Sequence, residues 1–146
     1  MALISIQDYW TGPGGVRRDE VYSLDLSTTV RANAMRWVAV ANDLAERLGL
    51  FGVVLSTSTK TGTPLASGWR PPAVNATTQG ASKTSLHMTG LAGDVYDPDG
   101  KIDDYLMDHQ DIMVEFGIWL EHPDNTPTWS HWQIVPPGSG NRVFRP

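Results

Sequence analysis

The segment from Ser27 to Leu48 constrains the fold of this chain most, because it is a long stretch with a single consistent periodicity. This spacing predicts an amphipathic helix with one face turned to a core. Ser27 is suited to cap the first turn through its hydroxyl, and Gly49 is suited to end the helix in a left-handed conformation. The apolar residues that recur at steps of three and four are Val30, Ala34, Trp37, Val38, Ala41, Leu44 and Leu48.

The other periodic segments are short, and loops rich in glycine and proline separate them. A second helix is predicted from about Asp103 to Phe116, with Gly117 as its stop. Residues 57–86 are predicted to form a long loop, a kind of segment that often carries function. The order of elements predicts one α+β domain over residues 1–146 with a mainly antiparallel sheet. The predicted strands are FGVVLSTST, LAGDVYD, GIWLE and TWSHWQIV, the last two joined by the turn HPDNTP.

The composition excludes several kinds of site. With 146 residues the chain can bury a core without a disulfide or a structural metal. Cysteine is absent, so any metal must be held by histidine and carboxylate side chains. The net charge is −5 with no basic stripe, which argues against nucleic-acid binding.

No apolar run approaches the ~18 residues of a membrane span, and MALISIQDYW lacks the features of a signal peptide. We therefore expect a chain that is made in the cytoplasm and does not bind a membrane. We also expect it to be a monomer.

The stretch SLHMTGLAGDVYD places His87 and Asp94 seven positions apart in an apolar, glycine-rich setting. A neutral imidazole and a carboxylate are both good zinc ligands, and catalytic zinc sites commonly use three protein ligands. Gly90 allows a turn between the two residues, and His131 could join them from a neighbouring strand. From spacing alone, a hydrogen-bonded structural pair is the alternative.

The surrounding residues add a longer pattern, which spans about Leu50 to Val135. TWSHWQ, which contains His131, follows that pattern in the expected order. Together these segments resemble the zinc D-Ala-D-Ala carboxypeptidases and L-Ala-D-Glu endopeptidases of cell-wall metabolism, which have the Hedgehog/DD-peptidase fold. The matching residues in SGWRPPAVNATTQGASKTSLHMTGLAGDV are Ser67, Gly68, Trp69, Arg70, Asn75, Gly80, Ser85, His87, Gly90, Ala92 and Asp94.

This resemblance implies a zinc ion held by His87, Asp94 and His131. It also implies that Arg70 binds the substrate carbonyl or carboxylate, a role suited to a permanently charged planar guanidinium. Two further residues are implied near the substrate, Ser85 as a hydrogen-bond donor and Trp69 as part of the wall. From the residues alone, the alternatives are an ion-paired Arg70, a turn-forming Ser85 and a core Trp69.

The general base is the point where the chain departs from the family. Many members carry a Glu or Asp three residues before the last zinc-binding histidine, but this chain has Thr128 there, which cannot take the proton. We predict that Glu121, at the end of GIWLE, is the base, and the alternative from the residues alone is a plain exposed carboxylate at the end of a strand. Asp124 is the alternative base, although its place in HPDNTP favours a role in the turn.

The remaining histidines and the C-terminal segment carry less chemistry. His109 lies on the apolar stripe of the second predicted helix, which predicts a half-buried, hydrogen-bonded core histidine. His122 should point away from Glu121 on its strand and is a candidate for a supporting or substrate contact only. PPGSGNRVFRP is predicted to be an ordered tail packed through Val143 and Phe144, with no chemistry assigned.

The resemblance implies a zinc peptidase that acts on peptidoglycan stem peptides, either as a carboxypeptidase or as an endopeptidase. A bacteriophage endolysin, which acts on the host cell wall, is the expected context, and a bacterial dipeptidase is the alternative. The competing interpretation is a zinc-binding module of the same fold without strong catalysis, such as a virion component, because a fold does not fix a function.

Overall fold

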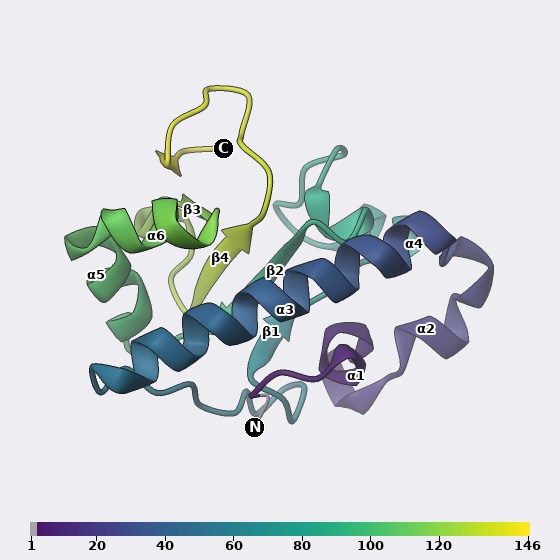
Figure 1. The fold of residues 1–146 in the computed structure, drawn as a ribbon. Coiled ribbons are helices and arrows are strands. Elements are labelled where there is room, and N and C mark those ends of the chain that lie inside the picture. Colours follow the sequence, from purple (N-terminus) through teal and green to yellow (C-terminus); the bar gives the residue numbers. More distant parts are fainter. Residues whose placement is uncertain (1–2) are drawn as a thin grey trace.

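A computed structural model describes residues 3–146 as helices packed around a five-stranded sheet (Figure 1). The strand order is β1-β2-β4-β3-β5, and every neighbouring pair is antiparallel except β3 with β5. The prediction of an α+β fold with a mainly antiparallel sheet is confirmed. The strands are β1 (Leu65–Ser67), β2 (Ala92–Tyr96), β3 (Trp119–Glu121), β4 (Trp129–Gln133) and β5 (Val143–Phe144).

The helix α3 crosses the sheet and provides much of the core (Figure 1). Trp37 lies fully buried on α3 and donates from Nε1 to the Trp132 carbonyl on β4 at 2.9 Å. A Cβ at Gly93 on β2 would lie 2.4 Å from the Trp37 ring, so only glycine allows this close approach. The helices are α1 (Ile6–Trp10), α2 (Arg18–Val21), α3 (Thr28–Leu50), α4 (Pro72–Thr77), α5 (Lys101–Asp108) and α6 (Gln110–Phe116).

The first predicted helix is confirmed, with a different end. The Ser27 hydroxyl accepts from the Val30 backbone N–H and caps the helix as expected. The helix continues through Gly49 to Leu50, and the glycine with a left-handed φ of 81° is Gly52. Within the part of the chain that the structure describes, no helix is both long and apolar enough to cross a bilayer.

The strand predicted over FGVVLSTST is wrong. This segment forms no strand, and Val54 is 72% exposed, because it runs outside the sheet without a pairing partner. The strand that pairs with β2 is instead β1, which aligns Leu65 with Val95. It lies inside the stretch that we expected to be a loop, as does α4. Pairing with the buried strand β2 therefore determines which segment forms a strand. The β-branched residues of FGVVLSTST do not.

The second predicted helix is split in two at His109, which has a non-helical φ of −134° and ψ of 56°. His109 is exposed, so the prediction of a core histidine is wrong. Its ring stacks on Tyr105 with centroids 4.0 Å apart, and its Nδ1 lies 2.8 Å from the Tyr105 carbonyl oxygen. Because the helix breaks at His109, this residue of the predicted apolar stripe lies outside the core. The predicted stop at Gly117 is confirmed.

The helix α1 is hydrogen-bonded to the start of β2 and to the segment that follows β1. Tyr9 on α1 is fully buried and donates from its hydroxyl to the Ala92 carbonyl on β2 at 2.6 Å. The Tyr9 carbonyl accepts from the Trp69 backbone N–H at 2.9 Å. These two bonds fix the segment that follows β1 to the start of β2.

Two buried carboxylates shape the start of α5. Asp97 accepts the backbone N–H groups of Ile102 and Asp103, so its side chain satisfies donors in the first turn of the helix. Asp103 is only 2% exposed and accepts from the Thr126 hydroxyl at 3.1 Å, but its other carboxylate oxygen has no partner. Burial raises the pKa of Asp103 to about 6.

Replacing Asp103 by Asn should therefore remove a titration that weakens the fold at neutral pH. The carboxyl has a higher pKa in the folded protein than in the unfolded chain, so its contribution to stability is complete below about pH 4. That contribution is lost as pH rises through about 6, and the loss amounts to about 3 kcal/mol at most. Thermal unfolding at about pH 4.5 and pH 7.5 should show the melting temperature of D103N gaining several degrees relative to wild type at the higher pH.

The neighbouring Asp104 provides a matched control, because it is exposed in the same helical turn. D104N should keep the pH dependence of the wild-type protein. An identical pH dependence in D103N and wild type would show that Asp103 does not titrate in this way.

Candidate metal centre

The sheet register places the candidate residues in one row across the strands. Asp94 on β2 lies directly opposite His131 on β4, and such antiparallel neighbours point to the same face. On the other side of β4, Leu120 pairs with Trp132, so the next position along this register brings Glu121 beside His131. Asp94, His131 and Glu121 thus share one face of the sheet.

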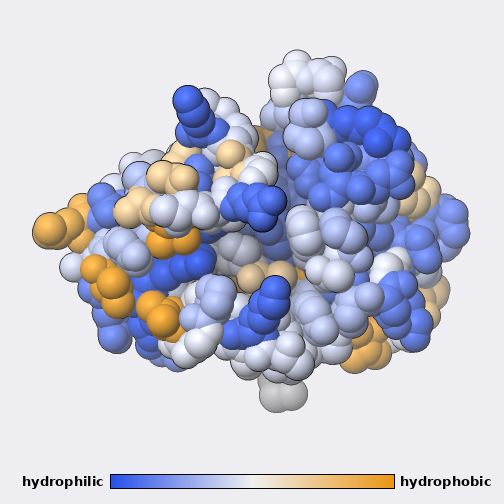
Figure 2. All heavy atoms as spheres, turned by 180° about the vertical axis from the view of Figure 1, so that it is seen from behind, coloured by the Kyte–Doolittle hydropathy of each residue, from blue (hydrophilic) through white to orange (hydrophobic). Residues whose placement is uncertain are grey.

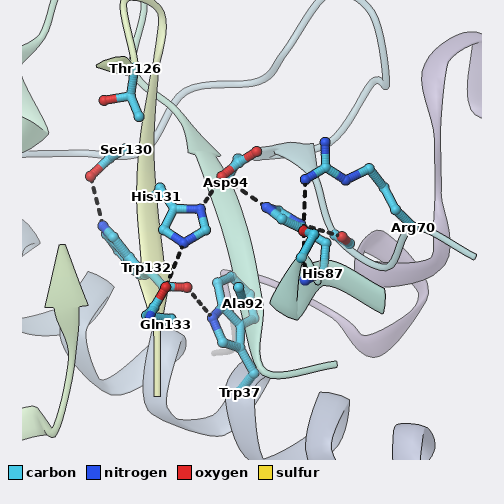
Figure 3. Close-up of polar contacts among 12 residues, drawn as sticks. Trp37, Arg70, His87, Ala92, Asp94, Thr126, Ser130, His131, Trp132 and Gln133 are labelled. Carbon is cyan, nitrogen blue, oxygen red and sulfur yellow. Dashed lines mark hydrogen bonds and ion pairs between the residues drawn. The ribbon is translucent and has the colours of Figure 1, made fainter. Parts of the chain in front are cut away.

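His87 reaches this row from the 3-10 turn Leu86–Met88, just before β2. Gly90 makes the tight connection with a left-handed φ of 82°, and a Cβ there would lie 2.7 Å from the Val30 carbonyl oxygen on α3. The Asp94 Oδ1 atom lies 3.2 Å from His87 Nε2 and 2.9 Å from His131 Nδ1 (Figure 3). One ligand atom from each residue lies within 4.8 Å of the other two, so the cluster could hold a metal ion.

The ring orientation of His87 is set by a backbone group. Its Nδ1 lies 2.8 Å from the Gly68 carbonyl oxygen, which can only accept a hydrogen bond. The proton of the neutral ring therefore sits on Nδ1, and the lone pair of Nε2 faces Asp94.

The ring of His131 is set by Gln133, two residues further along β4. The Gln133 amide donates from Nε2 to the Val135 carbonyl, which leaves Oε1 to accept from His131 Nε2 at 3.0 Å. The lone pair of His131 Nδ1 then points at Asp94. Two imidazole lone pairs thus converge on one carboxylate oxygen, an arrangement that requires a cation among them, either a proton or a metal.

The charges within the cluster suit metal ligands. Burial alone raises the pKa of the Asp94 carboxyl, but His87 and His131 outweigh it and hold that pKa well below its usual range. Burial lowers the pKa of His87, which keeps its ring neutral. For His131, burial is the largest single influence and lowers the pKa, but Asp94, Gln133 and Glu121 together outweigh it, so that the net pKa is raised. A metal and a proton therefore compete for the same position.

Arg70 lies beside the cluster without a carboxylate partner. Its Nη2 donates to the Ser85 hydroxyl at 3.2 Å, and its buried Nε has no hydrogen-bond partner. Among residues 3–146, no carboxylate oxygen lies within 4.0 Å of its guanidinium, so the alternative of an ion-paired loop arginine is not found. Ser85 also accepts the His87 backbone N–H at 3.3 Å, so its hydroxyl bonds both local backbone and Arg70.

Of the three positions considered for a general base, only Glu121 faces the cleft. Burial raises the pKa of Glu121, against the opposing influence of the positive charges of His131 and Arg70. Asp124 is exposed and pairs with Arg145 at 3.2 Å and with His122 at 3.6 Å, on the surface. Thr128 is also exposed, and its carbonyl accepts from the Asp97 N–H.

A cleft of about 720 Å³ opens over the cluster. One wall is the loop of residues 79–86, and the other is the C-terminal segment, including residues 135–139 and 144–146. Both loops project on the same side of the molecule in Figure 1, and Figure 2 shows the surface hollowed between two projecting parts. The C-terminal segment packs on the domain through Val143 and Phe144, as expected, but these residues also form the strand β5, and the segment shapes the cleft, neither of which was predicted.

Trp69 does not line this cleft. It is fully buried and donates from Nε1 to the Met88 carbonyl at 3.1 Å, so the expectation that it contacts substrate is corrected to a core role. Trp129 does line the cleft. Gln133 and the Gly68 carbonyl were also missed as partners of the two histidines, because their roles depend on pairing distant strands.

The chain was compared with family models, with curated proteins and with solved structures, and none of the three comparisons gave a match.

The hydrogen bond from His131 to Gln133 predicts that Gln133→Leu will weaken metal binding. Losing the acceptor leaves the His131 tautomer unconstrained, which should lower the affinity for Zn²⁺ by roughly 10- to 100-fold. Competition with a chromophoric chelator measures this affinity. Gln133→Glu keeps an acceptor oxygen and should stay close to wild type. Wild-type affinity in a folded Q133L protein would show that Gln133 does not orient the ligand.

Proposed function

We propose that this protein is a zinc-dependent peptidase that hydrolyses a peptide bond in peptidoglycan stem peptides, within the Hedgehog/DD-peptidase fold. The observation that carries the proposal is the convergence of His87, Asp94 and His131 at one point of a cleft, between Arg70 and Glu121. The motif resemblance supplies the substrate class. We extend the proposal to a phage lytic enzyme on the same resemblance.

The donor set suits zinc better than a hard cation. Two imidazole nitrogens and one carboxylate oxygen match the three-ligand sets of catalytic zinc sites, whereas Mg²⁺ and Ca²⁺ prefer oxygen ligands. The three residues line the cleft, so a fourth position can face the substrate. The chemistry that zinc supplies when bound is Lewis-acid polarisation of the scissile carbonyl and acidification of a water molecule.

The residues around the cluster have complementary roles in this proposal. Glu121 accepts a proton from the attacking water and passes it to the leaving amine, a task helped by a pKa raised through burial. Arg70 donates to the substrate carbonyl or carboxylate from nitrogens that have no carboxylate partner of their own. Ser85 holds the Arg70 fork in place through its hydroxyl.

A second candidate function is a zinc-binding module without catalysis. Thr128 favours it, because it stands where many peptidases of the resembling family have their acidic residue, and it is exposed outside the cleft. The two proposals share the metal and differ in hydrolysis. Metal analysis together with mass analysis of muropeptides released from purified sacculi separates them, since the module binds zinc and releases nothing.

Glu121→Gln tests the base directly. The variant should keep one metal ion per chain and lose hydrolysis by roughly 10²- to 10⁴-fold, because the amide cannot take up the proton. Asp124→Asn is the matched control, since Asp124 is an exposed carboxylate close in sequence and outside the cleft, and it should retain the wild-type rate. A folded, zinc-loaded E121Q protein with the wild-type rate would exclude Glu121 as the base.

His131→Ala should remove metal and activity together, because it takes away one ligand and leaves Asp94 without the partner at 2.9 Å. Metal content by mass spectrometry and sacculus hydrolysis are measured on the same preparation. Hydrolysis that survives the loss of His131 would contradict the proposed ligand set.

A further inference from the structure

Arg18 is a buried arginine whose charge is not balanced by a neighbouring acid. It is 9% exposed, and its guanidinium packs against the backbone at Gly12, where a Cβ would lie 2.6 Å from Arg18 Nε. Among residues 3–146, no carboxylate oxygen lies within 4.0 Å of it, and its neighbour Asp19 pairs with Arg17 instead at 2.7 Å. Buried charges are normally paired, so this exception calls for a reason.

The side chain of Arg18 is tied to the segment that carries Arg70. Its Nη1 donates to the Trp69 carbonyl at 2.9 Å, in the peptide unit that joins Trp69 to Arg70. The Arg70 N–H of the same peptide unit donates to the His87 carbonyl at 3.1 Å. One peptide plane thus connects Arg18, Arg70 and the backbone of a metal-cluster residue.

The charge of Arg70 disfavours the charge of Arg18. Burial lowers the pKa of Arg18, and the positive charge of Arg70 lowers it further. An arginine stays protonated in a protein, so Arg18 keeps a buried charge that no carboxylate within 4.0 Å neutralises among the described residues. Of the two residues, Arg70 lines the cleft and can contact an anionic ligand, whereas Arg18 does not line it.

We propose that Arg18 is a positioning residue that makes the Arg70 end of the cleft selective for ligands with a free carboxylate. It fixes the peptide plane of Arg70 through the Trp69 carbonyl and adds, outside the cleft, a second positive charge that favours a carboxylate bound at Arg70. The proposal rests on the proposed peptidase function for the identity of the ligand. It extends that function by naming a second cation, outside the cleft, that favours an anionic group on the substrate.

The variants separate charge from hydrogen bonding. Arg18→Gln keeps a donor for the Trp69 carbonyl and loses the charge, whereas Arg18→Lys keeps the charge and loses the planar fork. Arg17→Gln is the matched control, because Arg17 is the adjacent arginine, is partly exposed and is already neutralised by Asp19. Circular dichroism and zinc content confirm that each protein is folded and loaded.

The probes are N-acetyl-D-alanine and N-acetyl-D-alaninamide, which differ only in the carboxylate and contain no bond between two amino acids for the enzyme to cut. The dissociation constants of both are measured by titration calorimetry on the zinc-loaded proteins. R18Q should lose about tenfold of the preference for the carboxylate probe, whereas R18K and R17Q should stay within about threefold of wild type. A wild-type preference in R18Q, or an equal loss in R18K, would overturn the proposal.

A cycle with Arg70→Gln shows whether the effect passes through Arg70. If Arg18 acts on the ligand through that site, R18Q should change the carboxylate preference much less in the R70Q background. An undiminished effect would contradict the positioning role. Because the probes are bound and not cut, a protein that shows the Arg18-dependent preference but releases nothing from sacculi would refute only the peptidase proposal.

Discussion

The antiparallel pairing of β2 with β4 is the constraint on which the site depends. It sets Asp94 opposite His131, so that one residue from each central strand points to the same face of the sheet. The position is held from the other face by Trp37, which packs on Gly93 and donates to the Trp132 carbonyl. A slip of one residue in this register would turn Asp94 or His131 to the wrong face and dismantle the cluster.

Two neutral hydrogen-bonding groups orient the histidine rings of the cluster. The Gly68 carbonyl fixes one ring and Gln133 fixes the other, so that both imidazoles present a lone pair to Asp94. Gly68 belongs to the segment that Tyr9 anchors through Trp69. The N-terminal helices therefore contribute to the site although they supply none of the three residues of the candidate metal cluster. The same hydrogen bonds connect the core with the orientation of the His87 ring and with the position of Arg70.

The sequence predicted the parts of this arrangement that local pattern controls. The periodicity around Trp37 identified α3, and the alternation around Asp94 identified β2. The clustering of His87, Asp94 and His131 was also predicted, but from family-like motifs and not from spacing. The features that were predicted wrongly depend on partners far along the chain. The strand β1 exists because Leu65 pairs with Val95, and no propensity in residues 65–67 signals it.

Other features of the site were beyond the reach of sequence for the same reason. Gln133 looks like any polar strand residue until β4 turns it toward His131 with its amide fixed by Val135. Arg18 lies 51 residues from the carbonyl that it contacts, in a segment with no clear periodicity. The missing acid at position 128 was visible at once, but the assignment to Glu121 gained support only when the cleft excluded Asp124 and Thr128.

The most direct test of the proposed zinc site is a crystal structure of the zinc-loaded protein with anomalous scattering measured on both sides of the zinc edge. We expect one strong anomalous peak at about 2.0–2.2 Å from His87 Nε2, His131 Nδ1 and an Asp94 carboxylate oxygen. A protein that binds no zinc at this cluster, or that binds it through His87 Nδ1 or His131 Nε2, would contradict the proposed zinc site.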